Sequence, residues 1–351
     1  IGKLGGLKAS LKVVGEVGWI GLALFILNSA LVPAAPAVGW AMLMRAEGLN
    51  VSVWTALKAS FMGFPINFIA PSMYLGAQPL KVIYVANAHD VPKRRVLATI
   101  IVSNVQEIGA LLLVMIVAAA VALFRINFPP QQRWILIIGM GILVLCFGVG
   151  LYAFLGNFKP TVKFINLLAW FGVAKRKLAR LRTHAHEVEI IIQRSFTKGW
   201  KTFLASQAVT LISAVSILIR PWIFFLFAKN QWLEVQYLCA IYVVTNFINM
   251  VPHTPGGLGI LEGGFFGLFA LFNLGEGQAE QMAAGFSIVT RVADLVLILV
   301  GVVLIFALNM RAFAKSVAKG EQKLRVGDAA GVNTPTETRK IVRVEEPKVK
   351  R

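Results

Sequence analysis

Long runs of apolar residues, separated by short polar connections, fill most of the chain up to about residue 308. A helix needs roughly 20 mostly apolar residues to cross a bilayer. The pattern predicts spans at 18–44, 96–124, 133–155, 202–227, 233–251 and 282–308. We expect Pro33 and Pro36 to kink the first span and Arg220-Pro221 to interrupt the fourth. The predicted fold class is an all-α polytopic membrane protein, a helical bundle.

Two apolar stretches carry prolines and glycines that interrupt a helix. The first runs from Leu57 to Val91 and contains Pro65, Pro71, Gly76 and Pro79. We interpret it as a helical hairpin or a discontinuous span. The second reads PHTPGGLGILEGG over residues 252–264 and is expected to continue as a helix to Leu274. Non-helical backbone is tolerated at membrane depth only when it is buried in protein or lines a cavity. Two broken or re-entrant segments therefore predict a polar cavity, and their exposed N–H groups favour an anion such as a phosphate.

Polar stretches flank and divide this apolar region. Residues 1–17 are predicted to form an amphipathic approach segment, 18–310 the transmembrane domain, and 311–351 a disordered polar tail. Residues 156–201 hold ten Lys or Arg against two acids, with apolar residues at helical spacing. This pattern is typical of a helix that lies on an anionic membrane surface. We expect the basic loops and the tail to be cytoplasmic.

Composition supports the membrane interpretation and excludes a soluble enzyme. Hydrophobic residues make up 57% of the 351 positions, charged residues 15%, and the mean hydropathy is +0.73. A net charge of +19 would suggest nucleic acid in a soluble protein, but here the basic residues lie in loops and in the tail. Cys146 and Cys239 lie in apolar spans without metal-ligand spacing. We therefore expect no nucleic acid, no metal and no cofactor.

The chain repeats a pattern about 180 residues apart. Asn67-Phe-Ile precedes Pro71, and Asn246-Phe-Ile precedes Pro252. A glycine-containing break follows each, and then a span with a polar pair three residues apart. The breaks and pairs are Gly76 with Asn104 and Glu107, and Gly256, Gly257 and Gly259 with Arg291 and Asp294. Residues at i and i+3 share a helix face. Apolar helices can resemble one another by chance, but paired broken helices in matching halves point to a transporter-type site near the bilayer midplane.

Charged residues within the spans are the first candidates for chemistry, because a charge in hydrocarbon costs at least about 2.5–3.5 kcal/mol. For Arg291 and Asp294, a mutual salt bridge and a role in substrate binding both stay open. Arg220 could lie near an interface and extend its head to water. We expect Arg291 to contact an anionic head group bidentately, Asp294 to orient it, and Glu262 to be the proton-responsive group.

The candidate substrate-binding residues gather at the two breaks and at the polar pairs that follow them. No catalytic residue is assigned, and His253 could instead be a satisfied interior histidine. The full set is Asn67, Pro71, Gly76, Gln78, Lys81, Glu107, His253, Pro255, Gly256, Gly257, Gly259, Glu262, Arg291 and Asp294.

Two segments carry a family resemblance. Residues 70–85 (APSMYLGAQPLKVIYV) and 251–269 (VPHTPGGLGILEGGFFGLF) resemble the signature segments of the lysylphosphatidylglycerol synthase transmembrane, or flippase-like, family. The resemblance covers roughly residues 18–308. Many relatives read Gly-Gly-Glu-Pro-Leu-Lys in the first segment, where this chain has Gly-Ala-Gln-Pro-Leu-Lys over 76–81. Gln78 in place of the acid removes a charge, which argues against a proton or cation role at that position.

The resemblance implies a polytopic inner-membrane protein, bacterial in type, that moves or presents lipids. Well-known members add a soluble aminoacyl-transferase domain, and some members are linked to hopanoid or glycolipid pathways. We expect no such domain after residue 311, and hence a transporter rather than a catalyst. The expected partners are membrane lipids, either anionic phospholipid or a polyprenyl-type lipid, with an anionic or zwitterionic head. The alternatives are a membrane-embedded transferase acting on a lipid-linked substrate and an accessory subunit that recruits a lipid-synthesis enzyme.

Overall fold

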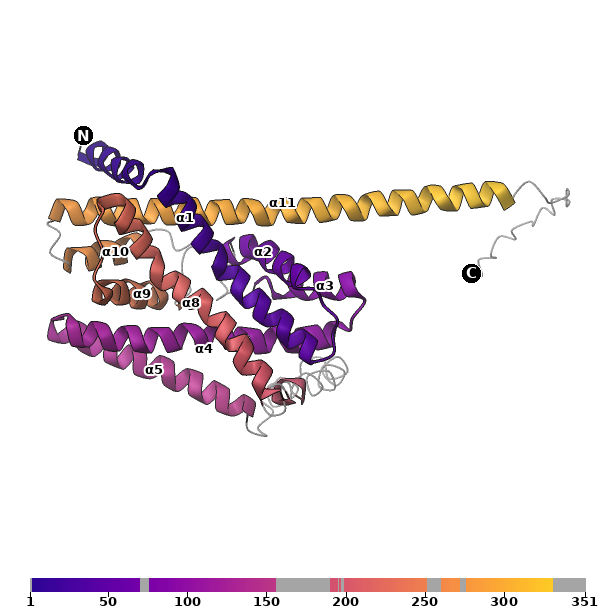
Figure 1. Cartoon of the computed structure of the whole chain (residues 1–351), viewed down its shortest axis with the longest axis horizontal. Coiled ribbons are helices and arrows are strands. Elements are labelled where there is room, and N and C mark those ends of the chain that lie inside the picture. The colour runs from indigo at the N-terminus through magenta and orange to yellow at the C-terminus, as the bar shows by residue number, and fades with distance from the viewer. Residues whose placement is uncertain are drawn as a thin grey trace, which may run out of the picture. The chain divides into compact units, whose positions relative to one another are not determined.

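The computed structural model describes residues 2–69, 76–155, 190–194, 196, 199–250, 260–271 and 276–330. The regular elements in these ranges are all helices (Figure 1). They are α1 (Gly2–Ala46), α2 (Val53–Ile69), α3 (Gln78–His89), α4 (Lys93–Arg125), α5 (Pro130–Leu155), α8 (Trp200–Lys229), α9 (Val235–Met250), α10 (Ile260–Leu271) and α11 (Glu276–Ala330). The chain divides into two compact units, residues 1–304 and 305–351, and the first of them holds the helix bundle.

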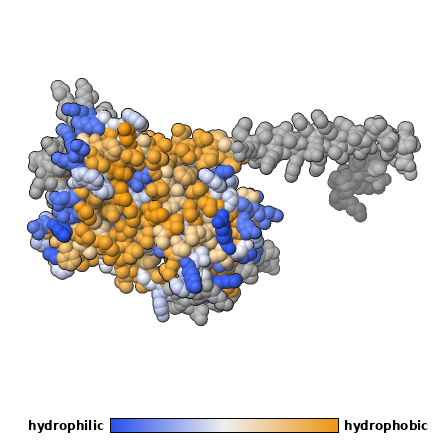
Figure 2. Space-filling model, viewed as in Figure 1, coloured by the Kyte–Doolittle hydropathy of each residue, from blue (hydrophilic) through white to orange (hydrophobic). Residues whose placement is uncertain are grey.

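Five of these helices are long and apolar enough to cross a membrane: 12–46, 93–125, 130–152, 200–229 and 280–308. Apolar side chains cover much of the bundle surface seen in Figure 2, and polar ones gather toward its two ends. The chain is thus an all-α polytopic membrane protein, as predicted. The predicted span at 233–251 is wrong, because α9 has only 16 residues. At about 1.5 Å per residue it is roughly 24 Å long, too short to cross a hydrocarbon layer of about 30 Å.

Prolines inside the long helices do not interrupt them. α8 is continuous through Pro221, where an interruption was predicted. α1 stays helical through Pro33 and Pro36 and departs from helical geometry at Gly18 (φ 66°, ψ 174°). Membrane helices tolerate proline where a neighbour satisfies the backbone groups that proline frees.

The tightly packed pair α1 and α8 shows how this is done. Pro36 has no N–H, so the carbonyl of Val32, four residues earlier, loses its helical donor. The Ser213 hydroxyl of α8 donates to that carbonyl at 3.1 Å. In the opposite direction, the Asn28 amide of α1 donates to the Ser216 carbonyl of α8 at 2.8 Å. Each helix therefore satisfies backbone groups of the other.

The segment α2–α3 is a re-entrant hairpin whose two ends lie at the same end of the bundle. Thr55, in the first turn of α2, and His89, the last residue of α3, are hydrogen-bonded at 2.9 Å. The guanidinium of Arg95, at the start of α4, donates to the carbonyl of Glu47 in the α1–α2 connection. The chain therefore enters through α2 and returns through α3 to where it began, which confirms the hairpin interpretation.

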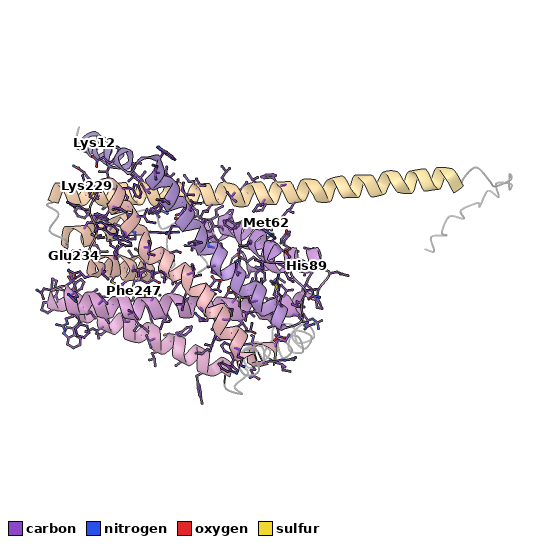
Figure 3. The ribbon with its side chains drawn as sticks, in the orientation of Figure 1. Lys12, Met62, His89, Lys229, Glu234 and Phe247 are labelled. Carbon is purple, nitrogen blue, oxygen red and sulfur yellow. The ribbon has the colours of Figure 1, made fainter. Side chains whose placement is uncertain are left out.

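The helices α9 and α10 form the corresponding hairpin, and it enters from the opposite end. α9 begins beside the end of α4, where Arg125 and Glu234 line one pocket. Lys229, at the end of α8, pairs with Glu16 near the start of α1 at 3.4 Å. Figure 3 shows Lys229 and Glu234 at one end and His89 at the other. α9 and α10 pack together, and only four residues separate α10 from α11, so α10 returns to the end where α9 starts.

The second hairpin is anchored by an aromatic cluster. Phe286 of α11 meets Phe25 of α1, Phe224 of α8 and Phe265 of α10 at ring-centroid distances of 6.2, 5.3 and 4.9 Å. Phe269 of α10 packs against Phe225 of α8 at 5.4 Å. Such edge-on aromatic contacts add to simple burial, and here they join four helices at the end where α9 enters.

The element order α1-α2-α3-α4 recurs as α8-α9-α10-α11. The hairpin limbs have 17 and 12 residues in the first half and 16 and 12 in the second. The halves also interlock: α4 packs on α9, and Gly301 of α11 lies against the Phe61 carbonyl and the Pro65 ring of α2. Because the hairpins enter from opposite ends, the internal echo of the sequence corresponds to a repeat of inverted topology.

Two sequence-based boundaries fall differently or lie outside the described residues. α11 runs to Ala330, so residues 311–330 are helical where disorder was predicted. Alanine, lysine, glutamate, glutamine and arginine dominate this stretch, and all are strong helix formers. The surface helix predicted within 156–201 lies outside the described residues from 156 to 189.

Candidate functional site

The break in the first hairpin is closed by a side chain from α2. The side-chain Oδ1 of Asn67 accepts a hydrogen bond from the Ala77 backbone N–H at 3.0 Å, just before α3 begins. Gly76 and Ala77 form the turn, and Pro79 stands in the first turn of α3, where its missing N–H costs no helical bond. Asn67, near the end of α2, therefore holds the start of α3.

The first turn of α3 meets the polar pair of α4. Gln78 is buried, and its side-chain Nε2 donates to the side-chain Oδ1 of Asn104 at 3.0 Å. Gln78 lies eleven residues before His89, and Asn104 lies eleven residues after Lys93. The two antiparallel helices therefore bring these residues to the same depth, about 17 Å from their connection.

Lys81 is the buried cation of this hairpin, with 9% of its surface exposed. Its stem crosses Gly63 of α2, where a Cβ would stand 2.7 Å from the Lys81 Cε. The Lys81 ammonium and the Glu107 carboxylate attract each other electrostatically. In the described part of the chain neither side chain has a direct hydrogen bond or ion pair. The first half thus holds a separated pair of opposite charges, a buried Lys81 and a partly buried Glu107.

The second half holds another charge cluster, on α8 and α11. Asp294 is attracted by both Arg220 and Arg291, and more strongly by Arg220. The Arg220 Nε is buried, so this side chain faces the bundle and does not extend to an interface. Arg291 and Asp294 are each partly buried. The sequence-based site omitted Arg220. Its position nine residues from the end of α8, about 14 Å into the span, was the signal that could have found it.

The structure thus brings Asn67, Gln78, Lys81 and Glu107 together with Asn104, and Arg291 and Asp294 together with Arg220. Gly76 lies at the hairpin turn. Six predicted residues lie outside the described residues: Pro71, His253, Pro255, Gly256, Gly257 and Gly259. For Glu262 only its place in α10 is described. The expectation that the two breaks meet in one cavity stays a prediction.

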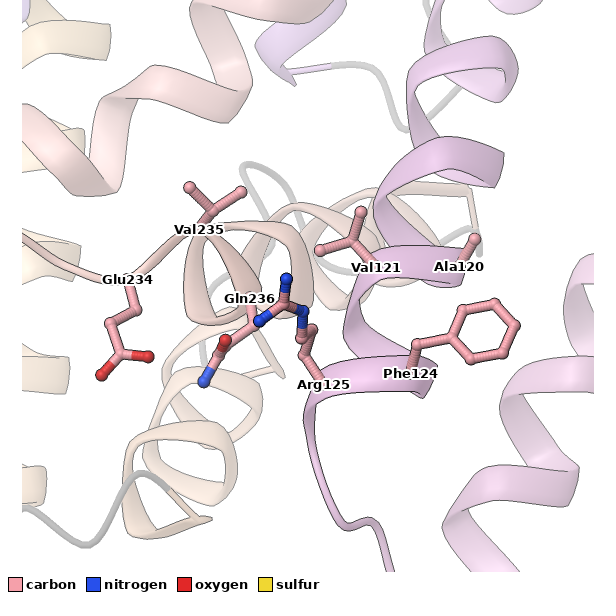
Figure 4. A pocket seen from close by; sticks show the side chains of 7 residues that line it. All are labelled: Ala120, Val121, Phe124, Arg125, Glu234, Val235 and Gln236. Carbon is pink, nitrogen blue, oxygen red and sulfur yellow. The ribbon is translucent and has the colours of Figure 1, made fainter.

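A pocket of about 740 Å³ lies elsewhere, between the end of α4 and the start of α9 (Figure 4). Figure 4 shows the Arg125 side chain reaching from the end of α4 toward α9, beside Gln236. Its lining is Ala120, Val121, Phe124, Arg125, Glu234, Val235 and Gln236, and none of these is a predicted site residue. The pocket sits at the bundle end and does not belong to the buried charge clusters.

Comparison with known proteins places the chain. The model of the lysylphosphatidylglycerol synthase TM region matches residues 3–301. A UPF0104 membrane protein of Methanocaldococcus jannaschii is 19% identical over 295 residues, covering 83% of this chain and 85% of the relative. A UPF0104 membrane protein of Methanothermobacter thermautotrophicus is 22% identical over 265 residues, covering 72% and 74%. Both relatives are archaeal, whereas a protein of bacterial type was expected. No solved structure matches the chain. The extent of the family match shows that this chain belongs to the family of the lysylphosphatidylglycerol synthase transmembrane region.

Proposed function

We propose that this protein translocates a lipid with an anionic or zwitterionic head group between the two leaflets of a membrane. The observation that carries the proposal is the pair of hairpins that enter the bundle from opposite ends, each followed by a long helix with a polar pair. Repeats of inverted topology with broken helices are the architecture by which many transporters offer one central site to each side in turn.

The first hairpin provides the chemistry that a head group needs. Lys81 supplies a buried ammonium with three donors, and Gln78 supplies an amide at the start of α3. The N-terminus of α3 adds the partial positive charge of the helix dipole. The N-cap residue Ala77 has no polar side chain that could cap this terminus. These groups suit a phosphate or a similar anion, while the acyl chains stay against the apolar outer surface of the bundle (Figure 2).

The charge distribution suggests an orientation in a cytoplasmic membrane. Lys93, Arg94 and Arg95 begin α4 at the end of the bundle where α2 starts and α3 finishes. Lys201 lies at the start of α8. The opposite end carries Glu16 and Glu234 beside its cations. By the positive-inside rule the first end faces the cytoplasm.

The test is lipid movement by the purified full chain in proteoliposomes. Head-group-labelled phosphatidylglycerol would be added to one leaflet, and its arrival in the other would be followed by a membrane-impermeant quencher. We expect the wild type to accelerate the movement and Lys81→Met to slow it at least about tenfold. Lys201→Met, a charge removal at an exposed end position, is the matched control and should transport normally. A wild type that moves lipid no faster than empty vesicles would contradict the proposal and favour an accessory role.

A further inference from the structure

We infer that an anionic phospholipid head group binds at Lys81 together with one proton taken up by Glu107, so that lipid and proton move as a neutral pair. This inference rests on the proposed function and adds to it the substrate charge and the coupling ion. It starts from the position of buried Lys81 on α3 and of Glu107 on α4, on opposite sides of the Gln78–Asn104 hydrogen bond that joins the two helices; the two charges attract each other.

The geometry leaves the Lys81 ammonium open to a second anion. In the described part of the chain, Lys81 has an electrostatic partner in Glu107 but no hydrogen-bond acceptor, although an ammonium carries three donors. Side chains of a helix lean toward its N-terminus. On α3 that direction is toward the hairpin tip, and on the antiparallel α4 it is toward the α3–α4 connection. Lys81 and Glu107 therefore lean toward each other from opposite sides of the Gln78–Asn104 hydrogen bond.

Counting charges shows why a proton must accompany the anion. Without ligand, one ammonium faces one carboxylate, and the pair is neutral. A phosphodiester adds one negative charge, and an uncompensated charge at this depth is strongly disfavoured. When Glu107 takes one proton, its carboxylate becomes a neutral carboxyl group and the ammonium pairs with the phosphodiester. The balance is one phosphodiester and one proton bound, with the local net charge unchanged at zero.

The helices packed against α4 bring few competing groups to Glu107. These neighbours are α1, α3, α5, α8 and α9, and α9 contains no charged residue. The Tyr242 hydroxyl of α9 donates to the Leu111 carbonyl, one turn beyond Glu107. On α8, Gln207 donates to the Gln106 carbonyl. Of the charged groups in the described residues, Lys81 is the one with a resolved electrostatic effect on Glu107. The other charged or titratable residues of these helices are Lys3, Lys8, Lys12, Glu16, Arg45, Tyr84, His89, Arg133, Cys146, Tyr152, Lys201, Arg220, Lys229, Tyr237 and Cys239.

The second half does not offer the same site. Asp294 is attracted by two guanidinium groups, so its carboxylate faces two cations where Glu107 faces one. Protonation of Asp294 would remove the negative charge that faces both guanidinium groups, Arg220 and Arg291. The first hairpin is therefore the place where an anion and a proton can exchange with each other.

Binding and proton uptake by the detergent-purified full chain test the inference. The probes are dioctanoyl-phosphatidylglycerol, zwitterionic dioctanoyl-phosphatidylcholine, and glycerophosphoglycerol, which lacks acyl chains. Calorimetry in buffers of different ionisation enthalpy gives both the dissociation constant and the number of protons taken up. For the wild type we expect about one proton per phosphatidylglycerol, and affinity that falls about tenfold per pH unit once Glu107 is ionised in the free protein. Phosphatidylcholine should bind without net proton uptake, because its head is neutral overall.

Variants separate the two claims. Glu107→Gln imitates the protonated acid, so it should bind phosphatidylglycerol tightly, with no proton uptake and no pH dependence. Lys81→Met should weaken phosphatidylglycerol binding at least about tenfold. If it does not fold, Lys81→Arg should retain both binding and proton uptake. Glycerophosphoglycerol binding as tight as that of the lipid would overturn the assignment to a lipid head group.

The two possible failures are distinct. If the wild type binds phosphatidylglycerol without taking up a proton, or if Glu107→Gln keeps the wild-type pH dependence, the coupling is refuted while lipid translocation stands. If the wild type binds neither lipid at any pH, the proposed function fails with it.

Discussion

Gly63 of α2 should tolerate an added side chain poorly, because the stem of Lys81 lies across this glycine. A Cβ at this position would stand 2.7 Å from the Lys81 Cε and 2.9 Å from the Ala77 Cβ. The favourable distance between carbon atoms is about 3.5–4.0 Å, so the Lys81 Cε must move by roughly 0.8–1.3 Å and the Ala77 Cβ by roughly 0.6–1.1 Å. Lys81 is flexible, but Ala77 is held at the start of α3 by the bond to Asn67.

Gly63→Ala should therefore cost about 1–3 kcal/mol of overpacking, offset by about 1 kcal/mol of improved helix propensity. The expected net effect is a loss of zero to about 2 kcal/mol, together with weaker head-group binding because Lys81 is displaced. The control is Gly141→Ala in α5, where the added Cβ meets nothing within 4 Å, so stability should hold or rise. The assays are the thermal midpoint in detergent and phosphatidylglycerol binding. If Gly63→Ala matches Gly141→Ala in both assays, the packing of Lys81 on α2 is refuted.

Three further predictions concern the helices, the orientation and the tail. Ser213→Ala should destabilise the bundle by about 1 kcal/mol, since it removes the donor to the Val32 carbonyl. In a Pro36→Ala background the cost should shrink, and a thermodynamic double-mutant cycle without coupling would contradict this. In a background lacking native cysteines, Glu234→Cys should react with an impermeant thiol reagent in intact cells and Lys93→Cys only after permeabilisation; the reverse pattern would invert the orientation. Deleting residues 320–351 should leave the thermal midpoint unchanged because they belong to the second unit, and loss of folded protein would contradict that.

The sequence predicted the break between α2 and α3 correctly, because proline and glycine act locally on a helix. The second predicted break, over 252–259, lies outside the described residues. The same rule failed at Pro221, where α8 continues. At Pro36, where α1 also continues, the Val32 carbonyl that the proline leaves without a helical donor accepts from the Ser213 hydroxyl of α8. That help comes from a residue about 180 positions away, and no local pattern reveals it. The predicted start of the tail at residue 311 does not coincide with the end of α11. The polarity of the residues indicated solvent exposure, while their helix propensity favoured continuation of α11 to Ala330.

At the site, the sequence identified Lys81 and Glu107 individually because charges in apolar spans stand out. Their pairing could not be predicted, since it depends on whether the chain turns back after residue 69 or continues across the membrane. Likewise, Asp294 and Arg291 share a helix face by their spacing, but the stronger influence of Arg220 comes from the packing of a separate helix. Spacing along one helix predicts neighbours on that helix and not partners on another.

The most direct test of a lipid head group at the first hairpin is an experimental structure of the full chain in a bilayer that contains phosphatidylglycerol. The account predicts head-group density within hydrogen-bond distance of the Lys81 ammonium, between α3 and α4, in the wild type and in Glu107→Gln. It also predicts that this density is lost in Lys81→Met. Lipid density confined to the outer surface of the bundle, with Lys81 and Glu107 closed into a direct ion pair, would contradict the account.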